Sequence, residues 1–178
     1  MSAPAASPAL CAVIVMGVAG SGKTTIGRAL AERLGWLFED GDAFHSAANV
    51  EKMRSGQPLT DEDRWPWLRA IAAELDHRRA AKEPVVIACS ALKRSYRAIL
   101  LDGRTDARLV YLRGRSQLIL SRLQARRGHY MPPALLDSQF RTLEEPGEAE
   151  HPLTVDVDGP VDAIVDTITA GLTAARVP

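Results

Sequence analysis

The sequence lacks an excess of charge of either sign: 22 Lys and Arg balance 22 Asp and Glu over 178 residues. A protein that binds duplex nucleic acid usually has a basic excess, because it neutralises several phosphates. Long apolar runs are also missing, and no stretch approaches the roughly 20 residues that span a bilayer. These absences argue against a nucleic-acid binder or a membrane protein, and the length predicts a single compact domain.

Cysteine is scarce, with only Cys11 and Cys89. Each borders a predicted strand, Cys11 before one and Cys89 after another, so in parallel neighbours their sulfurs would lie too far apart for a disulfide. The first ten residues contain no Lys or Arg and therefore lack the charged start of a signal peptide. We expect a disordered tail over residues 1–10, one domain over residues 11–178, and a cytoplasmic protein.

Short apolar runs alternate with longer helical patterns along the chain. The expected strands are residues 12–16, 36–39, 85–88, 108–112 and 154–157. The expected helices are residues 23–34, 65–80, 93–100, 116–126, 135–143 and 161–174. This alternation predicts an α/β fold, with a parallel sheet covered on both faces and the most apolar runs, 12–16 and 85–88, at its centre. Residues 41–63 and 127–133 are predicted to be irregular and to overhang the carboxyl edge of the sheet, where ligands bind.

Residues 17–24, GVAGSGKT, match G-x-x-x-x-G-K-[ST] between a predicted strand and a predicted helix, which is the context that this motif requires. Its glycines let backbone N–H groups wrap around an anion at the helix N-terminus. Lys23 is expected to reach the β- and γ-phosphates, and the Thr24 hydroxyl to bind Mg²⁺. The predicted nucleotide-binding residues here are Gly17, Gly20, Ser21, Gly22, Lys23, Thr24 and Thr25.

Two carboxylates, Asp40 and Asp42, follow the second predicted strand. Asp40 is expected to hold Mg²⁺ directly or through water, because the strand 85–88 ends without the acidic residue that many phosphate-loop enzymes use. Asp42 is expected to accept a hydrogen bond from a substrate hydroxyl and to take its proton during phosphoryl transfer. The alternative is an Asx-turn with solvated acids. His45 fits a substrate contact and a structural hydrogen bond about equally well.

Several further blocks appear in order along the chain: DGDAFH (40–45), GQPLTD (56–61), DRWPWL (63–68), ACSALK (88–93), YLRG (111–114), RLQARRGHYM (122–131) and LLDSQF (135–140). Between about residue 13 and residue 146, this pattern resembles the gluconokinase family. That family is in turn similar to the shikimate kinases, which are P-loop NTPases with three αβα layers, a five-stranded parallel sheet and a mobile lid, here about residues 123–138. The resemblance implies Mg²⁺- and ATP-dependent phosphorylation of D-gluconate to 6-phosphogluconate, as part of gluconate utilisation. Members of the family are commonly homodimers, which the sequence itself does not show.

Gluconate is a small polyhydroxylated carboxylate, so its site needs a cation and several polar groups. Arg64 offers a planar fork for the carboxylate, as the matching position does in shikimate kinases, and the alternative is a surface salt bridge to Asp61 or Asp63. Residues after the third strand should face the same edge, and Lys93 and Arg97 should add positive potential from one helix face. The expected substrate-binding residues are Asp42, His45, Arg64, Ser90, Ala91, Lys93, Arg97 and Gln139.

Three arginines gather at the end of a predicted helix and just after it. Arg122 is expected to bind ATP. Arg126 or Arg127 is expected to close over the nucleotide, exclude water and stabilise the moving phosphoryl group, completing a catalytic set with Lys23 and Asp42. The alternative is that the three only complement the helix dipole.

Two other functions remain open on the sequence alone. A kinase for another sugar acid or a small alcohol would need the same acids and cations. A nucleotide-gated regulatory module would bind ATP without a small-molecule acceptor, and the acid pair, Arg64 and the lid argue against it.

Overall fold

The computed structural model describes residues 9–125 and 133–174. These residues form one parallel sheet of five strands in the order β2-β3-β1-β4-β5. The strands are β1 (Ala12–Met16), β2 (Leu37–Asp40), β3 (Val85–Ala88), β4 (Ala107–Arg113) and β5 (Leu153–Asp156). The predicted α/β class and the central places of β1 and β3 are confirmed.

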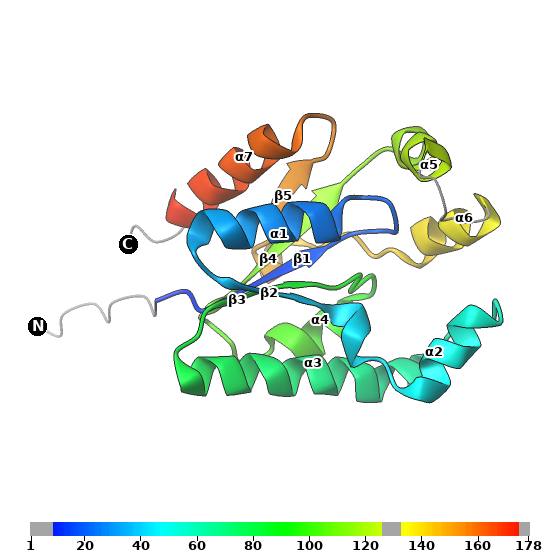
Figure 1. The fold of residues 1–178 in the computed structure, drawn as a ribbon, viewed down its shortest axis with the longest axis horizontal. Helices are drawn as coiled ribbons and strands as arrows, with labels where there is room; N and C mark the ends of the chain where they lie inside the picture. Colours follow the sequence, from blue (N-terminus) through cyan, green and yellow to red (C-terminus); the bar gives the residue numbers. More distant parts are fainter. Residues whose placement is uncertain (1–8, 126–132, 175–178) are drawn as a thin grey trace, which may run out of the picture.

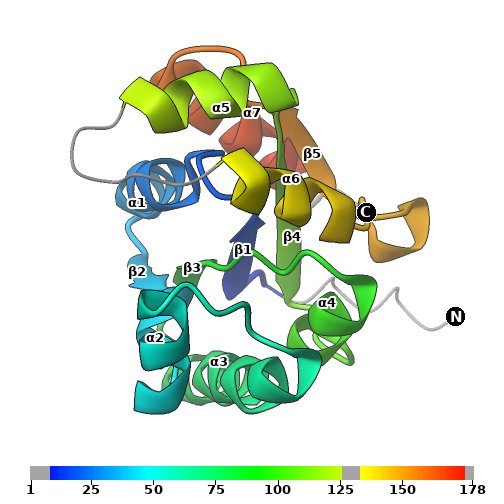
Figure 2. The ribbon, with the colours of Figure 1, turned by 90° about the vertical axis from the view of Figure 1, so that its right-hand side faces the viewer.

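Helices cover both faces of the sheet and its carboxyl edge (Figure 1). They are α1 (Lys23–Leu34), α2 (Ala47–Arg54), α3 (Asp61–Ala81), α4 (Arg94–Leu101), α5 (Ser116–Ala125), α6 (Pro133–Thr142) and α7 (Val161–Ala174), with short 3₁₀ turns η1 (Gly41–Phe44) and η2 (Glu148–Glu150). One face of the sheet packs against α1 and α7, and the other against α3 and α4. Figure 2 looks onto the carboxyl edge, with α5 and α6 on one side of it and α2 on the other.

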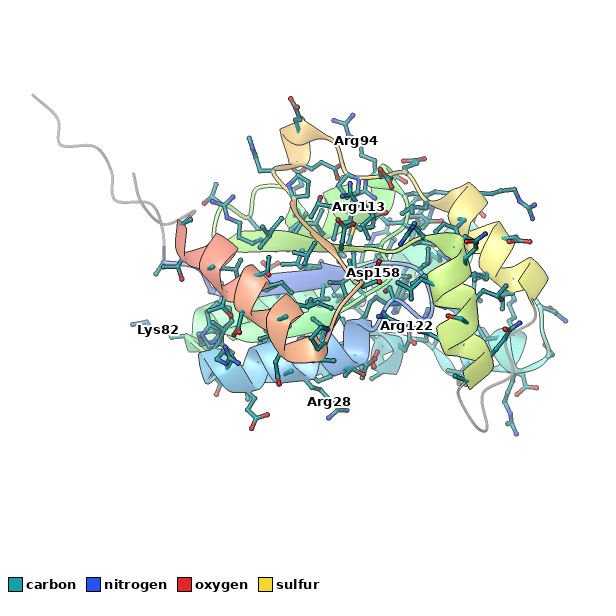
Figure 3. The ribbon with its side chains drawn as sticks, turned by 90° about the horizontal axis from the view of Figure 1, so that it is seen from above. Arg28, Lys82, Arg94, Arg113, Arg122 and Asp158 are labelled. Carbon is teal, nitrogen blue, oxygen red and sulfur yellow. The ribbon has the colours of Figure 1, made fainter. Side chains whose placement is uncertain are left out.

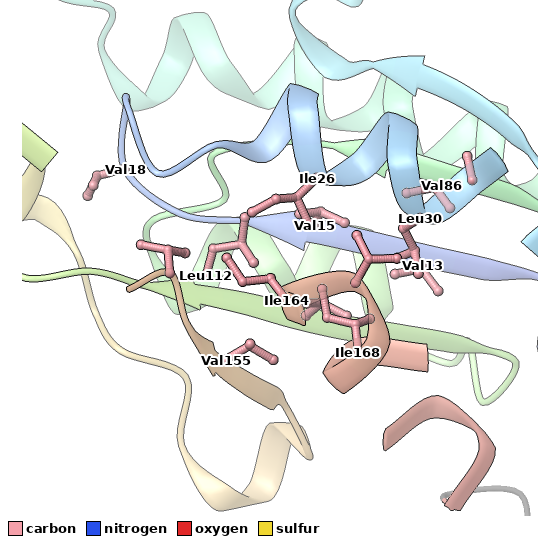
Figure 4. Close-up of a cluster of buried hydrophobic side chains, with 14 of the residues drawn as sticks. Val13, Val15, Val18, Ile26, Leu30, Val86, Leu112, Val155, Ile164 and Ile168 are labelled. Atoms are coloured by element: carbon pink, nitrogen blue, oxygen red, sulfur yellow. The ribbon is translucent and has the colours of Figure 1, made fainter. Parts of the chain in front are cut away.

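Two hydrophobic clusters hold these layers together. Along β1, Val13 and Val15 face the cluster under α1 and α7, which Figure 4 shows, and Ile14 and Met16 face the cluster over α3 and α4. All four side chains are fully buried. Because successive strand residues point to opposite faces, an apolar run without alternation belongs in a strand covered on both sides.

The structure differs from the sequence prediction mainly between residues 41 and 63, which contain η1 and α2 and are not irregular throughout. Ser46 begins α2 by accepting a hydrogen bond from the Asn49 N–H at 3.2 Å. The helix predicted from residue 65 begins at Asp61, because Thr60 and Asp63 form a reciprocal capping box. The helix predicted from residue 93 begins at Arg94, with Lys93 as its N-cap.

Both cysteines are free thiols, as predicted. Burial raises the pKa of Cys11 to about 11 and that of Cys89 to about 12, so both stay protonated at neutral pH. Within residues 9–125 and 133–174, no helix is long and apolar enough to cross a membrane. Residues 1–8 of the predicted tail and residues 126–132 of the predicted lid lie outside the described residues.

Candidate active site

The loop between β1 and α1 requires glycine at specific points. Gly20 has φ of +80°, and a Cβ there would lie 2.7 Å from Cγ of Leu123. A Cβ at Gly17 would lie 2.6 Å from Oγ of Ser21 and 3.0 Å from the carbonyl oxygen of Leu112. The loop therefore keeps its tight path next to β4 and α5 only without side chains at these two positions.

The groups in this loop suit the binding of phosphate. Ser21 is fully buried, and among the described residues its hydroxyl is the one buried side-chain N or O atom without a hydrogen-bond partner. An unpaired buried hydroxyl is costly, and a phosphate oxygen is an acceptor of the kind it lacks. Lys23 donates from Nζ to the carbonyl of Val18 at 3.0 Å, which places its ammonium over the loop. The residues present thus fit the phosphates of a nucleotide.

The two predicted metal ligands come from the first turn of α1 and the end of β2. Thr24 donates from Oγ1 to Oδ2 of Asp40 at 3.1 Å, so the two predicted metal ligands are side by side. Hydroxyl and carboxylate oxygens suit Mg²⁺, which keeps several waters and commonly takes only one or two protein ligands beside substrate phosphates. The described residues contain no group of three or more His, Cys, Asp and Glu that could hold a metal alone. The donor set therefore fits a Mg²⁺ ion shared with a nucleotide.

Asp42 is the exposed member of the acid pair. Its backbone N–H donates to Oδ1 of Asp40 at 3.1 Å, so Asp40 forms the turn considered as an alternative while also contacting Thr24. The Asp42 side chain is 83% exposed and lies at the same edge of the sheet. Asp40 thus forms the Asx-turn that was the alternative to a binding role. The Asp42 carboxylate takes no part in this turn and is open to a substrate.

His45 is buried beside this acid pair. Its ring stacks on Trp67 with centroids 4.2 Å apart, and its Nε2 lies 3.9 Å from Oδ1 of Asp42. Burial lowers the pKa of His45, and the nearby Arg64 acts in the same direction, whereas Asp42 opposes it. Trp67 is itself fixed by donating from Nε1 to the carbonyl of Gly41 at 2.7 Å.

A second polar group joins α3 to α4. Asp61 accepts hydrogen bonds from Nζ of Lys93 at 3.0 and 2.9 Å and from the hydroxyl of Tyr96. Arg64 lies 3.3 Å from the Tyr96 oxygen and 4.0 Å from Asp61. The bond from Tyr96, followed by that from Lys93, holds the pKa of Asp61 below its usual value. Arg64 and Lys93 therefore lie around the same carboxylate, and the alternative expected for Arg64, a salt bridge to Asp61, is present at the limit of contact.

Ser90 and Ala91 follow β3 at the carboxyl edge, as predicted. Ala91 is buried with φ of +44°, a left-handed conformation that is uncommon for a residue with a Cβ. Such backbone conformations are often found at functional sites.

The prediction for Arg97 is wrong. This side chain is 1% exposed and pairs bidentately with Glu150, at 2.6 and 3.0 Å. Its Nη1 also donates to the carbonyls of Ala91 and Leu92 at 3.1 Å each. Because α4 begins after Lys93, the two cations do not share the expected helix face, and Arg97 braces the turn after β3 from inside the protein.

Two predicted site residues on α5 and α6 make hydrogen bonds to distant parts of the chain. Gln139 on α6 accepts a hydrogen bond at Oε1 from the backbone N–H of Ala19, in the glycine-rich loop, at 2.7 Å. Arg122 on α5 donates from Nη2 to the carbonyl of Val157, after β5, at 2.6 Å (Figure 3). The predicted catalytic residues Arg126 and Arg127 lie outside the described residues.

Sequence reasoning missed three residues of this site: Asn49, Asp61 and Tyr96. Asp61 and Tyr96 stand in the family blocks or beside them, but only the fold brings them together. Asn49 is 5% exposed and lies between His45 and the start of α3. In the sequence, Asn49 is one polar residue in a stretch predicted to be irregular, and nothing local shows that the fold buries it.

Comparisons with known proteins agree with this arrangement. Residues 19–159 match the family model described as shikimate kinase. The gluconokinase of Gluconobacter oxydans is 46% identical over 156 residues, covering 88% of each chain. The thermoresistant gluconokinase of Escherichia coli is 42% identical over 153 residues, covering 85% of this chain and 87% of that one.

Solved structures give the same result. A gluconokinase from Sinorhizobium meliloti superposes with a TM-score of 0.84 at 45% identity, covering 96% of this chain and 94% of that one. A shikimate kinase from Bacteroides thetaiotaomicron, at 19% identity and a TM-score of 0.66, shares the fold. With a matching family model and relatives above 40% identity over most of their length, the chain belongs to the gluconokinase family, within the shikimate kinase fold.

Proposed function

We propose that this protein is a gluconokinase, which transfers the γ-phosphoryl group of ATP to D-gluconate and yields 6-phosphogluconate and ADP. The observation that carries the proposal is the convergence, at one edge of the sheet, of the glycine-rich loop, the Thr24–Asp40 pair and the open carboxylate of Asp42. The identity to proteins named gluconokinase over nearly their whole length supports the choice of acceptor.

The nucleotide is bound by the loop amides and Lys23, which exchanges its bond to Val18 for phosphate oxygens. Thr24 and Asp40 would hold Mg²⁺, and a bound Mg²⁺ neutralises charge on the phosphates. Asp42 then orients the acceptor hydroxyl and takes its proton as the oxygen attacks the phosphorus. The lid supplies Arg126 or Arg127 to stabilise the phosphoryl group and exclude water, and Arg122 contacts the nucleotide.

The acid group of the substrate is recognised by the cations between α3 and α4. Arg64 provides two parallel N–H groups for a carboxylate, and Lys93 and the Tyr96 hydroxyl lie beside it. Asp61 is the counter-ion that the protein itself supplies to this group. His45, Ser90 and Ala91 contact the substrate hydroxyls from the neighbouring loops.

The proposal also includes the localisation, the domain organisation and the partners of the enzyme. Two free, protonated thiols suit the reducing cytoplasm. Residues 11–178 act as one domain with a lid near residues 123–138. The acceptor is a small molecule, and a homodimer stays a prediction from the family.

A coupled assay of ADP release tests the proposal on a panel of acceptors at fixed Mg-ATP. We expect turnover with D-gluconate to exceed that with other sugar acids, with shikimate and with nucleoside monophosphates. Faster turnover with another sugar acid would show that gluconate is not the preferred substrate, while the proposed phosphoryl transfer would stand. ATP binding without turnover on any acceptor would favour the regulatory module instead.

A further inference from the structure

The amide of Asn49 has a determined orientation. Its Nδ2 lies 2.8 Å from the backbone carbonyl of Asp63 and 3.4 Å from Nδ1 of His45. A backbone carbonyl can only accept a hydrogen bond, so the NH₂ group, and not the amide oxygen, must face Asp63. The second N–H of the same NH₂ group is then the one that faces His45.

This orientation determines where His45 carries its proton. Because Nδ1 of His45 faces an N–H donor, it must be the acceptor nitrogen, and the neutral ring then has its proton on Nε2. Nε2 faces the carboxylate of Asp42 at 3.9 Å, and an N–H is the group that a carboxylate favours there. The opposite tautomer would set N–H against N–H at Asn49 and a lone pair against the carboxylate at Asp42.

The charged form of His45 is disfavoured by the same surroundings. A proton on both nitrogens would again place an N–H of His45 against that of Asn49. The side chain of His45 is 4% exposed, stacked on Trp67, and near the cation of Arg64. Asp42 is the group that opposes these effects, and its own side chain is 83% exposed to water, which weakens its influence.

We propose that Asn49 is a positioning residue, which fixes His45 as the Nε2–H tautomer so that this ring steers the Asp42 carboxylate toward the acceptor hydroxyl. At 3.9 Å the two groups attract each other without a formed hydrogen bond, and rotation of the exposed Asp42 side chain brings an oxygen within range of Nε2. The tautomer stands on contacts alone, and its catalytic use rests on the proposed kinase function. His45 thus acts in the site as a hydrogen-bond donor through Nε2, and not as a proton acceptor.

The direct test is the ¹⁵N NMR spectrum of the imidazole groups in the full-length protein at neutral pH. Long-range ¹H–¹⁵N correlations distinguish the two neutral tautomers and the charged ring, and the spectrum of His45→Gln identifies the signals of His45. We expect the Nε2–H pattern in the wild type. An Nδ1–H or charged His45 in the wild type would overturn the proposal without any mutant.

Variants separate this role from a merely structural one. Asn49→Asp replaces the donor by an acceptor, and we expect it to move the His45 proton to Nδ1 or to charge the ring. We also expect kcat with gluconate to fall at least tenfold, with unchanged affinity for an ATP analogue. The matched control is Arg54→Ala, at an exposed position of the same helix, which should leave the tautomer unchanged. An Nε2–H pattern in Asn49→Asp, or normal kcat after the tautomer has moved, would contradict the proposal.

A second pair of variants covers the case in which Asn49→Asp does not fold. The terminal amide of Gln lies near the place of Nε2, and that of Asn near the place of Nδ1. We therefore expect His45→Gln to retain more of kcat than His45→Asn, and the reverse order would count against a donor at Nε2. If the wild type phosphorylates no gluconate, the proposed function fails, whereas the NMR result still decides the tautomer.

Discussion

The hydroxyl of Thr24 lies 3.1 Å from Oδ2 of Asp40, which joins the first turn of α1 to the end of β2. In the proposed function, this pair takes the role of the acidic residue that the sequence lacks after β3. It also puts a hydroxyl and a carboxylate next to the loop that wraps the phosphates. The proposed metal site and the proposed phosphate-binding loop therefore adjoin at the start of one helix.

Asp40→Asn removes the negative charge from this pair and should weaken binding of Mg²⁺. We expect kcat/KM for Mg-ATP to fall at least about tenfold, which corresponds to 1.4 kcal/mol, and half-maximal activity to need more Mg²⁺. Titration of the activity with Mg²⁺ at fixed ATP measures this effect. Asp158→Asn, which changes an exposed acid after β5, is the control (Figure 3). An unchanged Mg²⁺ dependence in Asp40→Asn would remove Asp40 as a ligand.

Asp42→Asn preserves the shape of the side chain and removes its basicity. We expect kcat to fall by about 10²- to 10⁴-fold, because a positioned general base contributes on that order. The affinity for an ATP analogue, measured by calorimetry, should not change, since Asp42 lies outside the loop that binds the phosphates. Near-normal turnover would show that Asp42 is not the base.

Arg64→Lys preserves the charge and loses the planar fork. We expect KM for gluconate to rise about tenfold or more while KM for ATP stays the same, because Lys does not hold a carboxylate bidentately. The exposed Arg69 on the same helix supplies the control, Arg69→Lys. Equal rises in both Michaelis constants would point to a general disturbance of α3 and not to the acid group of the substrate.

Gln139 ties α6 to the glycine-rich loop through the Ala19 N–H. Gln139→Leu should lower the free energy of unfolding by about 1 kcal/mol, the usual contribution of one hydrogen bond, as measured by urea denaturation. Gln139→Glu keeps an acceptor and adds a charge beside the phosphate site, so it should weaken ATP binding more than it lowers stability. If Gln139→Leu weakens ATP binding more than Gln139→Glu does, electrostatic repulsion is not the cause.

Arg97 should matter for stability and not for the affinity for gluconate. Arg97→Met leaves the carboxylate of Glu150 without its cationic partner, and breaking a buried ion pair costs about 3–5 kcal/mol. We expect a loss of that order in urea denaturation, with KM for gluconate unchanged well below the melting temperature. Arg94→Ala, at an exposed position of the same helix, should change stability by less than about 0.5 kcal/mol. A rise in KM for gluconate in Arg97→Met without a loss of stability would restore the role predicted from the sequence.

The same ion pair sets a dependence on pH. Burial raises the pKa of Glu150, but hydrogen bonds from Arg97 and the Gly147 N–H outweigh it and lower the pKa below its ordinary value of 4.5. The stabilisation is therefore complete above pH 4.5 and is lost as the pH falls through the lowered pKa of the folded state. Urea denaturation across this acidic range should show a smaller pH dependence in Glu150→Gln than in the wild type.

The sequence predicted those parts of the site that depend on local pattern. The loop at residues 17–24 follows directly after an apolar strand and contains the glycines, Lys23 and Thr24. Its structure therefore depends on residues that are close together in the sequence. The central places of β1 and β3 follow from uninterrupted apolar runs. Asp40 and Asp42 were placed correctly because the end of a parallel strand defines the edge where their side chains lie.

Long-range partners could not be predicted in the same way. Arg97 and Glu150 are 53 residues apart, so the ion pair that buries Arg97 depends on the folded chain and not on the local helix pattern. Gln139 meets Ala19 across 120 residues. The short helix α2 buries only Asn49, so no apolar periodicity marked it. In each case the decisive contact is made by the folded chain and leaves no local signal.

The most direct measurement is the identity of the product formed from D-gluconate and Mg-ATP. ³¹P NMR and mass spectrometry of the reaction mixture should show one phosphomonoester, at the oxygen on carbon 6, formed in equal amount to ADP, and Asp42→Asn should form it far more slowly. Inorganic phosphate in place of the ester, or a phosphoryl group on another oxygen of gluconate, would contradict the proposed reaction.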